Sequence, residues 1–258
     1  MNRTIKLLAT LVAALGLTAL VAGSAAAETH QPLKLTAGEY PAILTGEQIE
    51  DGALKDHVFE GALGEITCKK ALFHGTIADK DHNTEITITP TYSECTQLPV
   101  TGGSFPMTVE MTHCDYLLTE GTEVAGSNGD EFNKGQISLT CPNEGEKPHT
   151  KVYNDAAHTS LRCEYTVDTF VHKGEITYTN TTKEGVTKDV DMTWKVSGVV
   201  TTRTFGTFLQ CGAATTESTY TGTTTVRAYQ DKGFTVTNTT PTVYDITEGA
   251  QVSLTVSK

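Results

Sequence analysis

Apolar and polar residues alternate with a period of two along most of this chain, which is the pattern of β-strands with one buried face. In the clearest run, Met192, Trp194 and Val196 share one face, and Val200 is expected to continue it. Tyr165, Val167 and Val171 form a similar run earlier in the chain. After Ala27, no long segment keeps the helical spacing of an amphipathic helix. The pattern therefore predicts an all-β protein.

Residues 66–95 predict a β-hairpin closed by a disulfide. Two Thr-rich, β-branched runs flank the polar turn 79–83, as in a hairpin. If residues whose numbers sum to 163 face each other, Cys68 lies opposite Cys95. The same register pairs Ala71 with Tyr92, Phe73 with Pro90, and Ile77 with Ile86. A shift of the register by one residue would turn these apolar side chains to the opposite face of the sheet. The apolar pattern and the opposed cysteines therefore predict the same register.

A second hairpin is expected between Cys114 and Cys141, around a turn at Ser127–Asp130. Both hairpins follow the pattern Cys-x3-Leu-x2-Gly-Thr-x18-Cys, which begins once at Cys68 and again at Cys114. A register in which residue numbers sum to 255 pairs Tyr116 with Leu139 and Leu118 with Ile137. A true internal repeat and a chance alignment of common residues both account for the similarity.

The parity of the buried positions changes between these hairpins. Met107 and Met111 lie on odd numbers, whereas Tyr116 and Leu118 lie on even ones. Because side chains in a strand alternate strictly, the switch predicts a β-bulge or a break near His113.

The segment Pro142–Pro148 is expected to divide the chain. It combines two prolines, a glycine and several charges in a short stretch, which is typical of a linker. We expect a first β unit at 28–145 and a second at 146–258, each an antiparallel sandwich-like or barrel-like unit stapled by disulfides. The chain that follows Ala27 is long enough for either one large β domain or two small ones.

All six cysteines lie after Ala27, in an even number, as in proteins of oxidising compartments. The two hairpins predict the bridges Cys68–Cys95 and Cys114–Cys141, which close loops of equal length. Elimination leaves Cys163–Cys211 as the third bridge. The main competing arrangement joins Cys95 to Cys114 and Cys141 to Cys163.

The segment 1–27 has the three regions of a signal peptide. Arg3 and Lys6 provide a short basic region, Leu7–Val21 an apolar run, and Ala25–Ala27 a small-residue cleavage site. The alternative, a membrane anchor, is disfavoured because the apolar run is shorter than the ~20 residues that span a bilayer. We therefore expect a secreted or extracellular protein that is either free or held at the cell surface without covalent attachment, and that is not inserted in the membrane.

The charge of the chain excludes one class of partner. The whole sequence carries a net charge of −12, and removal of the signal peptide leaves 17 basic against 31 acidic residues. Nucleic acid is an improbable partner, because binding it requires lysine and arginine to neutralise phosphates. The acidity is explained by solubility. The sequence does not indicate an oligomeric state.

Motifs of known chemistry are absent from the sequence. There is no nucleophile elbow, zinc-protease motif or phosphate-binding loop, and His158 beside Ser160 does not make a triad. The eight histidines lack metal-ligand spacing, so we expect them at exposed strand and loop positions. Carboxylates in the loops 78–83 and 127–131 could bind calcium, but solvated turns explain them better. We expect no catalytic residue, no metal and no cofactor.

A set of short motifs spans Tyr40 to Tyr229. They are Tyr40-Pro41-Ala42, Pro90-x-Tyr92-x-x-Cys95, Cys114-Asp115-Tyr116, Cys141-Pro142, His158-Thr159-Ser160-x-x-Cys163-x-Tyr165-Thr166 and Tyr220-Thr221-Gly222-Thr223. Together they resemble a group of uncharacterised secreted, Thr-rich, disulfide-containing β proteins of high-GC Gram-positive soil bacteria. The resemblance implies export and β architecture, and it transfers no catalytic residue.

Three functional hypotheses follow from the sequence. The leading one is a non-enzymatic binding or structural module of the cell envelope or medium, whose partner is a cell-surface polymer or another protein. The second is an extracellular hydrolase that acts on polysaccharide or peptide with carboxylates from loops. The third is a protease inhibitor whose reactive segment is Thr96–Phe105. A low aromatic content of 7% and a single tryptophan, expected in the core, argue against a sugar-stacking platform.

Overall fold

The structure is a computed structural model. It describes residues 34–48, 57–61, 64–80, 85–98, 103–119, 122–123, 125, 131–183, 187–212, 214–231, 235–240, 243–247 and 250–257. The predicted signal peptide and the turn Ser127–Asp130 lie outside these residues. Most of the turn 79–83 and residues 99–102 of the loop Thr96–Phe105 also lie outside them.

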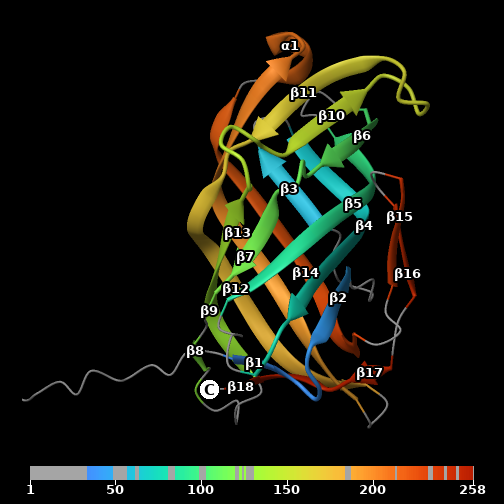
Figure 1. The fold of residues 1–258 in the computed structure, drawn as a ribbon. Helices are drawn as coiled ribbons and strands as arrows, with labels where there is room; N and C mark the ends of the chain where they lie inside the picture. Colours follow the sequence, from blue (N-terminus) through green and yellow to red (C-terminus); the bar gives the residue numbers. More distant parts are fainter. Residues whose placement is uncertain are drawn as a thin grey trace, which may run out of the picture. The chain divides into compact units, whose positions relative to one another are not determined.

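The all-β prediction is confirmed, since nearly every described element is a strand (Figure 1). The first nine strands are β1 (Lys34–Ala37), β2 (Ala42–Gln48), β3 (His57–Gly61), β4 (Gly64–Ile77), β5 (Ile86–Leu98), β6 (Phe105–Glu110), β7 (Asp115–Leu118), β8 (Thr122–Glu123) and β9 (Glu131–Thr140). The remaining elements are β10 (His149–Tyr153), β11 (Leu161–Val167), β12 (Phe170–Lys183), β13 (Thr187–Phe205), α1 (Phe208–Cys211), β14 (Thr215–Gln230), β15 (Thr235–Thr240), β16 (Val243–Thr247), β17 (Gln251–Val252) and β18 (Leu254–Ser257).

Fourteen of the strands form one antiparallel sheet, whose pairings close on themselves. One circuit runs β4-β5-β7-β9-β12-β13-β14-β2 and back to β4. A second runs β4-β5-β6-β10-β11-β13-β14-β3 and back to β4. Both circuits share four long strands, which are β4, β5, β13 and β14. Inward-facing side chains of these strands therefore contact side chains from both circuits. Two further pairs, β1 with β18 and β15 with β16, form small separate sheets.

The segment Pro142–Pro148 joins two strands of this one sheet. It connects β9 to β10, and β10 pairs with β6, which precedes the segment. Strands β2 and β3 likewise pair with β14, far beyond it. The expected division between 28–145 and 146–258 therefore does not separate two sheets. Composition identified a stretch outside the strands, but it carried no information about pairing between distant strands.

Both predicted hairpin registers are present. Cys68 lies opposite Cys95 between β4 and β5, and Tyr116 lies opposite Leu139 between β7 and β9. One predicted pair is wrong: Ile77 faces Ala42 of β2 instead of Ile86. The reason is that the ladder between β4 and β5 ends at Gly75 and Ile88, so Ile77 keeps only its partner on β2 and Ile86 only its partner on β7.

The parity switch near His113 is confirmed as a break between β6 and β7. Thr112 and His113 both adopt positive φ angles, of 51° and 62°. The turn is closed by a hydrogen bond of 2.8 Å from the Cys114 amide to the Met111 carbonyl oxygen.

Two expected buried positions are wrong because a strand shifts its register. Val199 is buried in place of Val200, since β13 shifts against β14 between Val196 and Val199. Gly198 lies in that shift at a φ of +68°, a conformation that glycine adopts without strain. In β12, Val171 is 69% exposed, because the pairing with β9 shifts just after Phe170.

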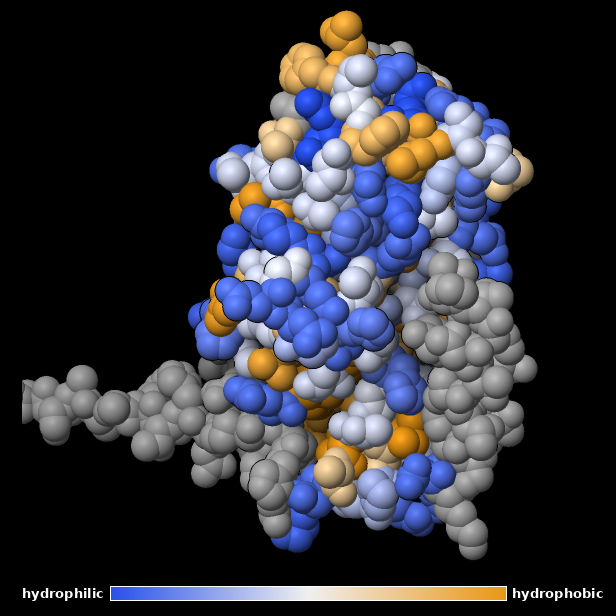
Figure 2. Space-filling view, turned by 45° about the horizontal axis from the view of Figure 1, so that its top comes forward, coloured by the Kyte–Doolittle hydropathy of each residue, from blue (hydrophilic) through white to orange (hydrophobic). Residues whose placement is uncertain are grey.

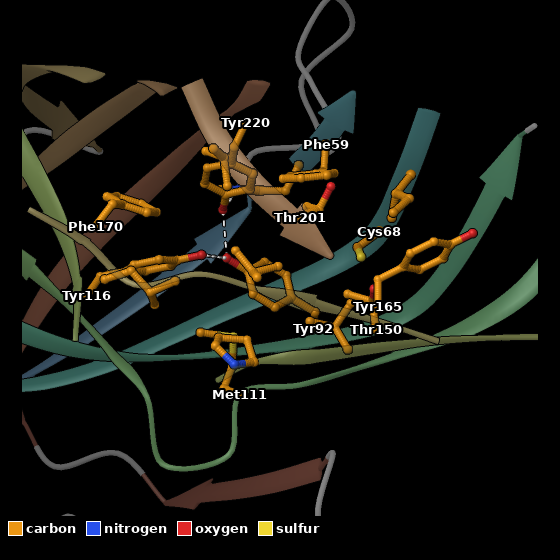
Figure 3. Close-up of a pocket in the computed structure, with 17 residues that line it drawn as sticks. Phe59, Cys68, Tyr92, Met111, Tyr116, Thr150, Tyr165, Phe170, Thr201 and Tyr220 are labelled. Atoms are coloured by element: carbon orange, nitrogen blue, oxygen red, sulfur yellow. Dashed lines mark hydrogen bonds between the residues drawn. The ribbon is translucent and has the colours of Figure 1, made fainter. Parts of the chain in front are cut away.

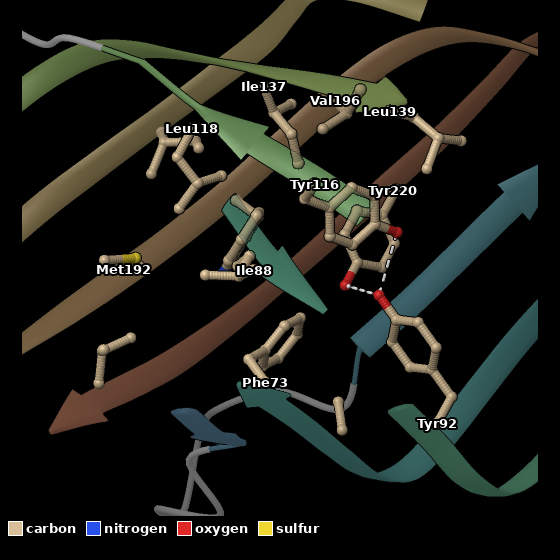
Figure 4. Close-up of a cluster of buried hydrophobic side chains, with 14 of the residues drawn as sticks. Phe73, Ile88, Tyr92, Tyr116, Leu118, Ile137, Leu139, Met192, Val196 and Tyr220 are labelled. Atoms are coloured by element: carbon tan, nitrogen blue, oxygen red, sulfur yellow. Dashed lines mark hydrogen bonds between the residues drawn. The ribbon is translucent and has the colours of Figure 1, made fainter. Parts of the chain in front are cut away.

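The three disulfides join Cys68 to Cys95, Cys114 to Cys141, and Cys163 to Cys211, as the sequence predicts. The core is one continuous cluster of buried apolar side chains from both circuits, part of which Figure 4 shows. Trp194 lies within it, 1% exposed, and its ring stacks on Phe73 with centroids 5.4 Å apart. The expectation that this tryptophan belongs to the core is confirmed.

Candidate functional site

Three tyrosine hydroxyls meet in the middle of the interior. Tyr92 of β5, Tyr116 of β7 and Tyr220 of β14 are all buried, and their rings converge from different strands (Figure 4). The Tyr92 Oη lies 2.7 Å from the Tyr220 Oη and 3.1 Å from the Tyr116 Oη. These residues are inward-facing members of alternating runs, so the strand pattern alone brings them together.

His57 of β3 extends this cluster. Its Nδ1 lies 2.5 Å from the Tyr220 Oη, and its Nε2 lies 3.0 Å from the Thr224 Oγ1. The imidazole ring occupies the space above Gly222, where a Cβ atom would lie 2.4 Å from the His57 Nδ1. A glycine at position 222 is therefore required for the histidine to be accommodated.

The hydrogen-bond chain is uncharged at neutral pH. Burial lowers the pKa of His57 to about 4, against the opposing effect of a hydrogen bond to the Thr223 backbone. Burial raises the pKa of Tyr116 to about 12 and that of Tyr92 well above its ordinary value. The neutral ring carries one proton, on Nδ1 or on Nε2; when the proton is on Nε2, Nδ1 accepts a hydrogen bond from Tyr220.

With the proton on Nε2, the hydroxyls of the chain form one ordered series. Tyr220 donates to the His57 Nδ1, Tyr92 donates to Tyr220, and Tyr116 donates to Tyr92. All three hydroxyl protons are then used inside the protein. A neutral, fully engaged cluster of this kind supplies neither a nucleophile nor a general base at neutral pH.

An interior pocket of about 80 Å³ lies against the tyrosine cluster (Figure 3). Its walls are almost entirely apolar, and they contain no carboxylate among the described residues. The lining residues are His57, Phe59, Ile66, Cys68, Tyr92, Val109, Met111, Tyr116, Leu139, Pro148, Thr150, Tyr165, Val167, Phe170, Val199, Thr201 and Tyr220. The pocket therefore combines an apolar body with hydroxyl groups from tyrosine and threonine.

A larger groove of about 680 Å³ lies elsewhere on the sheet, and its lining combines five threonines and two lysines with the apolar residues Val58, Leu98 and Trp194. One row of directly paired residues crosses five strands, and paired residues point to the same face of a sheet. The row runs Lys195, Thr221, Val58, Thr67 and Thr96. With strands about 4.8 Å apart, the row extends over about 19 Å. Lys69 and Glu65 also line the groove.

The second surface feature is an apolar tip at α1. Phe205, Phe208 and Leu209 are 50%, 62% and 89% exposed. Figure 2 shows apolar surface at this end of the molecule. The tip is held by the Cys163–Cys211 disulfide and by a 2.7 Å hydrogen bond from the Tyr165 hydroxyl to the Cys211 carbonyl oxygen. Exposed apolar side chains gathered on a fixed element are typical of contact surfaces.

The six predicted site residues are all disulfide-bonded, and they lie in three separate places. In the part of the chain that the structure describes, no three His, Cys, Asp or Glu side chains gather as metal ligands would. The two loops considered for calcium lie largely outside the described residues. None of the described helical structure is long and apolar enough to cross a membrane.

The cluster of tyrosine and histidine side chains is not among the features predicted from the sequence. The expectation that every histidine is exposed is wrong for His57, which is 2% exposed. The available signal was its spacing, because His57 and Phe59 alternate on one face of the short strand β3. The hairpin registers predict Tyr92 and Tyr116 on apolar faces, but nothing in the sequence predicts that their hydroxyls meet.

Comparisons with known proteins give no information about the function of the site. No family model matches the chain, and neither a curated protein nor a solved structure matches it. Function is therefore argued from the chain's own geometry.

Replacing Tyr92 by phenylalanine is expected to lower the free energy of unfolding by about 1–3 kcal/mol, because Tyr116 and Tyr220 then lose their shared buried partner. Denaturant unfolding followed by circular dichroism measures the change. Tyr153→Phe is the matched control, since Tyr153 is only half-buried. Equal stability of the two variants would contradict the buried chain.

Proposed function

We propose that this protein is a non-enzymatic binding module of the cell envelope or medium, and that its groove binds an acidic polysaccharide. The observation that carries the proposal is the groove of about 680 Å³, which combines threonine hydroxyls with two lysines. Its volume falls within the ~300–1,000 Å³ typical of ligand sites. The three disulfides support an oxidising compartment for the module.

The charge of the groove favours an anionic partner. Lys69 and Lys195 are both exposed; the charge of Lys69 helps to lower the pKa of the Glu94 carboxyl, and Lys195 forms no ion pair with a described residue. They stand out in a chain with a net charge of −12, which otherwise repels anions. Carboxylates of the polymer would pair with the two ammonium groups, while its hydroxyls would bond to the row of Thr67, Thr96 and Thr221.

The same groove is a poor candidate for hydrolysis. Glycosidases use two carboxylates on opposite sides of the scissile bond. Among the described lining residues the groove contains one carboxylate, Glu65, and this accepts a 2.9 Å hydrogen bond from the Thr67 hydroxyl. This arrangement supports binding without cleavage, and so favours the module over the hydrolase alternative.

The apolar tip supports a second candidate function, which is docking onto an apolar surface of another protein. Phe208 and Leu209 protrude from a helix whose last residue is fixed by a disulfide, so little conformational entropy would be lost on contact. The protease inhibitor hypothesis gains no comparable support, because residues 99–102 of its segment lie outside the described residues.

Affinity electrophoresis through polygalacturonate, with neutral dextran as reference, tests the polymer proposal. We expect retardation by polygalacturonate alone, weakening as salt rises. The double variant Lys69→Gln/Lys195→Gln is expected to bind about tenfold more weakly, which corresponds to ~1.4 kcal/mol. Lys134→Gln, which removes one exposed lysine outside the groove, is the control for loss of a surface charge and should bind as the parent does.

Three results would overturn this assignment. Equal retardation of the double variant and Lys134→Gln would mean that charge at the groove plays no part. If polygalacturonate retards neither the double variant nor Lys134→Gln, the groove does not bind acidic polysaccharide. If retardation by polygalacturonate is lost only in the variant Phe208→Ser/Leu209→Ser, the contact with the polymer lies at the apolar tip.

A further inference from the structure

The short strand β3 is held in the sheet mainly by one side chain. Of its five residues only His57 is buried, whereas the other four are half-buried or exposed. The His57 imidazole lies 2.5 Å from the Tyr220 Oη and 3.0 Å from the Thr224 Oγ1, both on β14. Because a strand with little buried surface is among the first parts of a fold to open, the attachment of β3 depends on this histidine.

The neighbours of β3 have other partners in the sheet. Strand β3 lies between β4 and β14, where Val58 faces both Thr67 and Thr221. On its other side, Thr67 of β4 faces Thr96 of β5, and Thr221 of β14 faces Lys195 of β13. If β3 leaves, β4 and β14 each stay paired at the same positions. The strand can therefore open as a local unit while the rest of the sheet remains folded.

The described groups around the His57 imidazole carry no charge at neutral pH. They are Gln48 of β2, Phe73 of β4, Tyr92 of β5, and Tyr220 and Thr224 of β14, with Tyr116 of β7 joined through Tyr92. Burial raises the pKa of all three tyrosines, so none of them provides an anion. A protonated imidazole would still form hydrogen bonds here, but its charge would be buried without a counter-charge, which is costly.

We propose that β3 is an acid-sensitive latch: uptake of a proton by His57 favours release of the strand from β4 and β14, while the other strands stay paired. In the open form water solvates the imidazolium, and in the closed form nothing balances its charge. Because His57 and Phe59 line the interior pocket, release of β3 opens this pocket to solvent (Figure 3). The latch does not depend on which ligand the outer groove binds.

Hydrogen exchange of the backbone amides at pH 7.5 and pH 5, followed by two-dimensional NMR, tests the latch. Each rate is compared with that of an unstructured peptide at the same pH, which gives a protection factor. The pKa of His57 is about 4 in the closed strand and 6.5 when solvated, so protection in His57–Gly61 should fall about 30-fold at pH 5. Strand β12, which pairs with β9 and β13, should keep higher protection than β3 at both pH values.

Two variants identify the group that titrates. His57→Gln keeps a hydrogen-bonding side chain and does not titrate, so protection in its β3 should be the same at both pH values, even if it is lower throughout. His172→Asn removes an exposed histidine at a φ of +49°, which asparagine tolerates, and should keep the response of the parent.

Three results would overturn the latch. Protection in β3 of the parent that does not change with pH would show that proton uptake leaves the strand closed. Equal protection of β3 and β12 would show that β3 opens only when the whole sheet unfolds. A 30-fold fall that persists in His57→Gln would assign the response to another group.

Discussion

Replacing Trp194 by alanine is expected to lower the free energy of unfolding by about 3–5 kcal/mol. The side chain is 1% exposed and lies at the junction of the two circuits, where its ring stacks on Phe73 and packs 5.9 Å from Tyr116. Removing it would open a cavity that the surrounding strands cannot close, because their hydrogen-bonded pairings fix their spacing. Denaturant unfolding followed by far-ultraviolet circular dichroism measures the loss.

Val171→Ala is the control for this prediction, since it also truncates a large apolar side chain but at a position 69% exposed. Its effect should stay within about 0.5 kcal/mol. Trp194→Phe should fall between the two, as it retains a ring against Phe73 and loses no hydrogen bond: the Trp194 Nε1 has no partner among the described residues. Similar losses for Trp194→Ala and Val171→Ala would contradict the central position of the tryptophan.

Acidification is expected to cost up to about 3 kcal/mol through His57 alone. Burial lowers the pKa of this histidine from 6.5 to about 4 in the folded protein. Between these values the unfolded chain binds a proton that the folded chain does not, so stability falls as the pH falls. The contribution is complete above pH 6.5 and lost by about pH 4. Free energies of unfolding measured from pH 7.5 to 4 test the sign and the range.

A variant without the imidazole separates His57 from the other titrating groups. His57→Gln keeps a hydrogen-bond acceptor and donor near Tyr220 and Thr224 but does not titrate. Its stability should depend less on pH than that of the parent between pH 6.5 and 4, even if its stability at pH 7.5 is lower. Identical slopes in the two proteins would show that His57 is not buried and neutral.

Local signals in the sequence predicted local structure well. Alternation identified the strands, and cysteine spacing together with the apolar pattern determined the registers of β4 with β5 and of β7 with β9. These agree because a two-residue period allows one register to bury the apolar set. The break at His113 followed from the same period.

Features that depend on distant strands could not be predicted in this way. The pairing of β3 with β14 brings His57 to Tyr220 across 163 positions, and no local pattern encodes it. The groove depends on the same pairing, since its row of residues comes from five strands. Register shifts, as at Val199, also defeated the strict alternation, because a single inserted residue moves every later side chain to the other face.

The pairing of β1 with β18 makes this fold a good subject for circular permutation. Lys34 lies opposite Ser257 and Ala37 opposite Leu254, so the first and last described strands lie side by side. A short peptide could join these strands, and new termini could be cut in the exposed turn at Glu144–Gly145, which connects β9 to β10. Such a rearranged chain would keep every strand pairing, and it would present fusion partners at a different edge of the sheet.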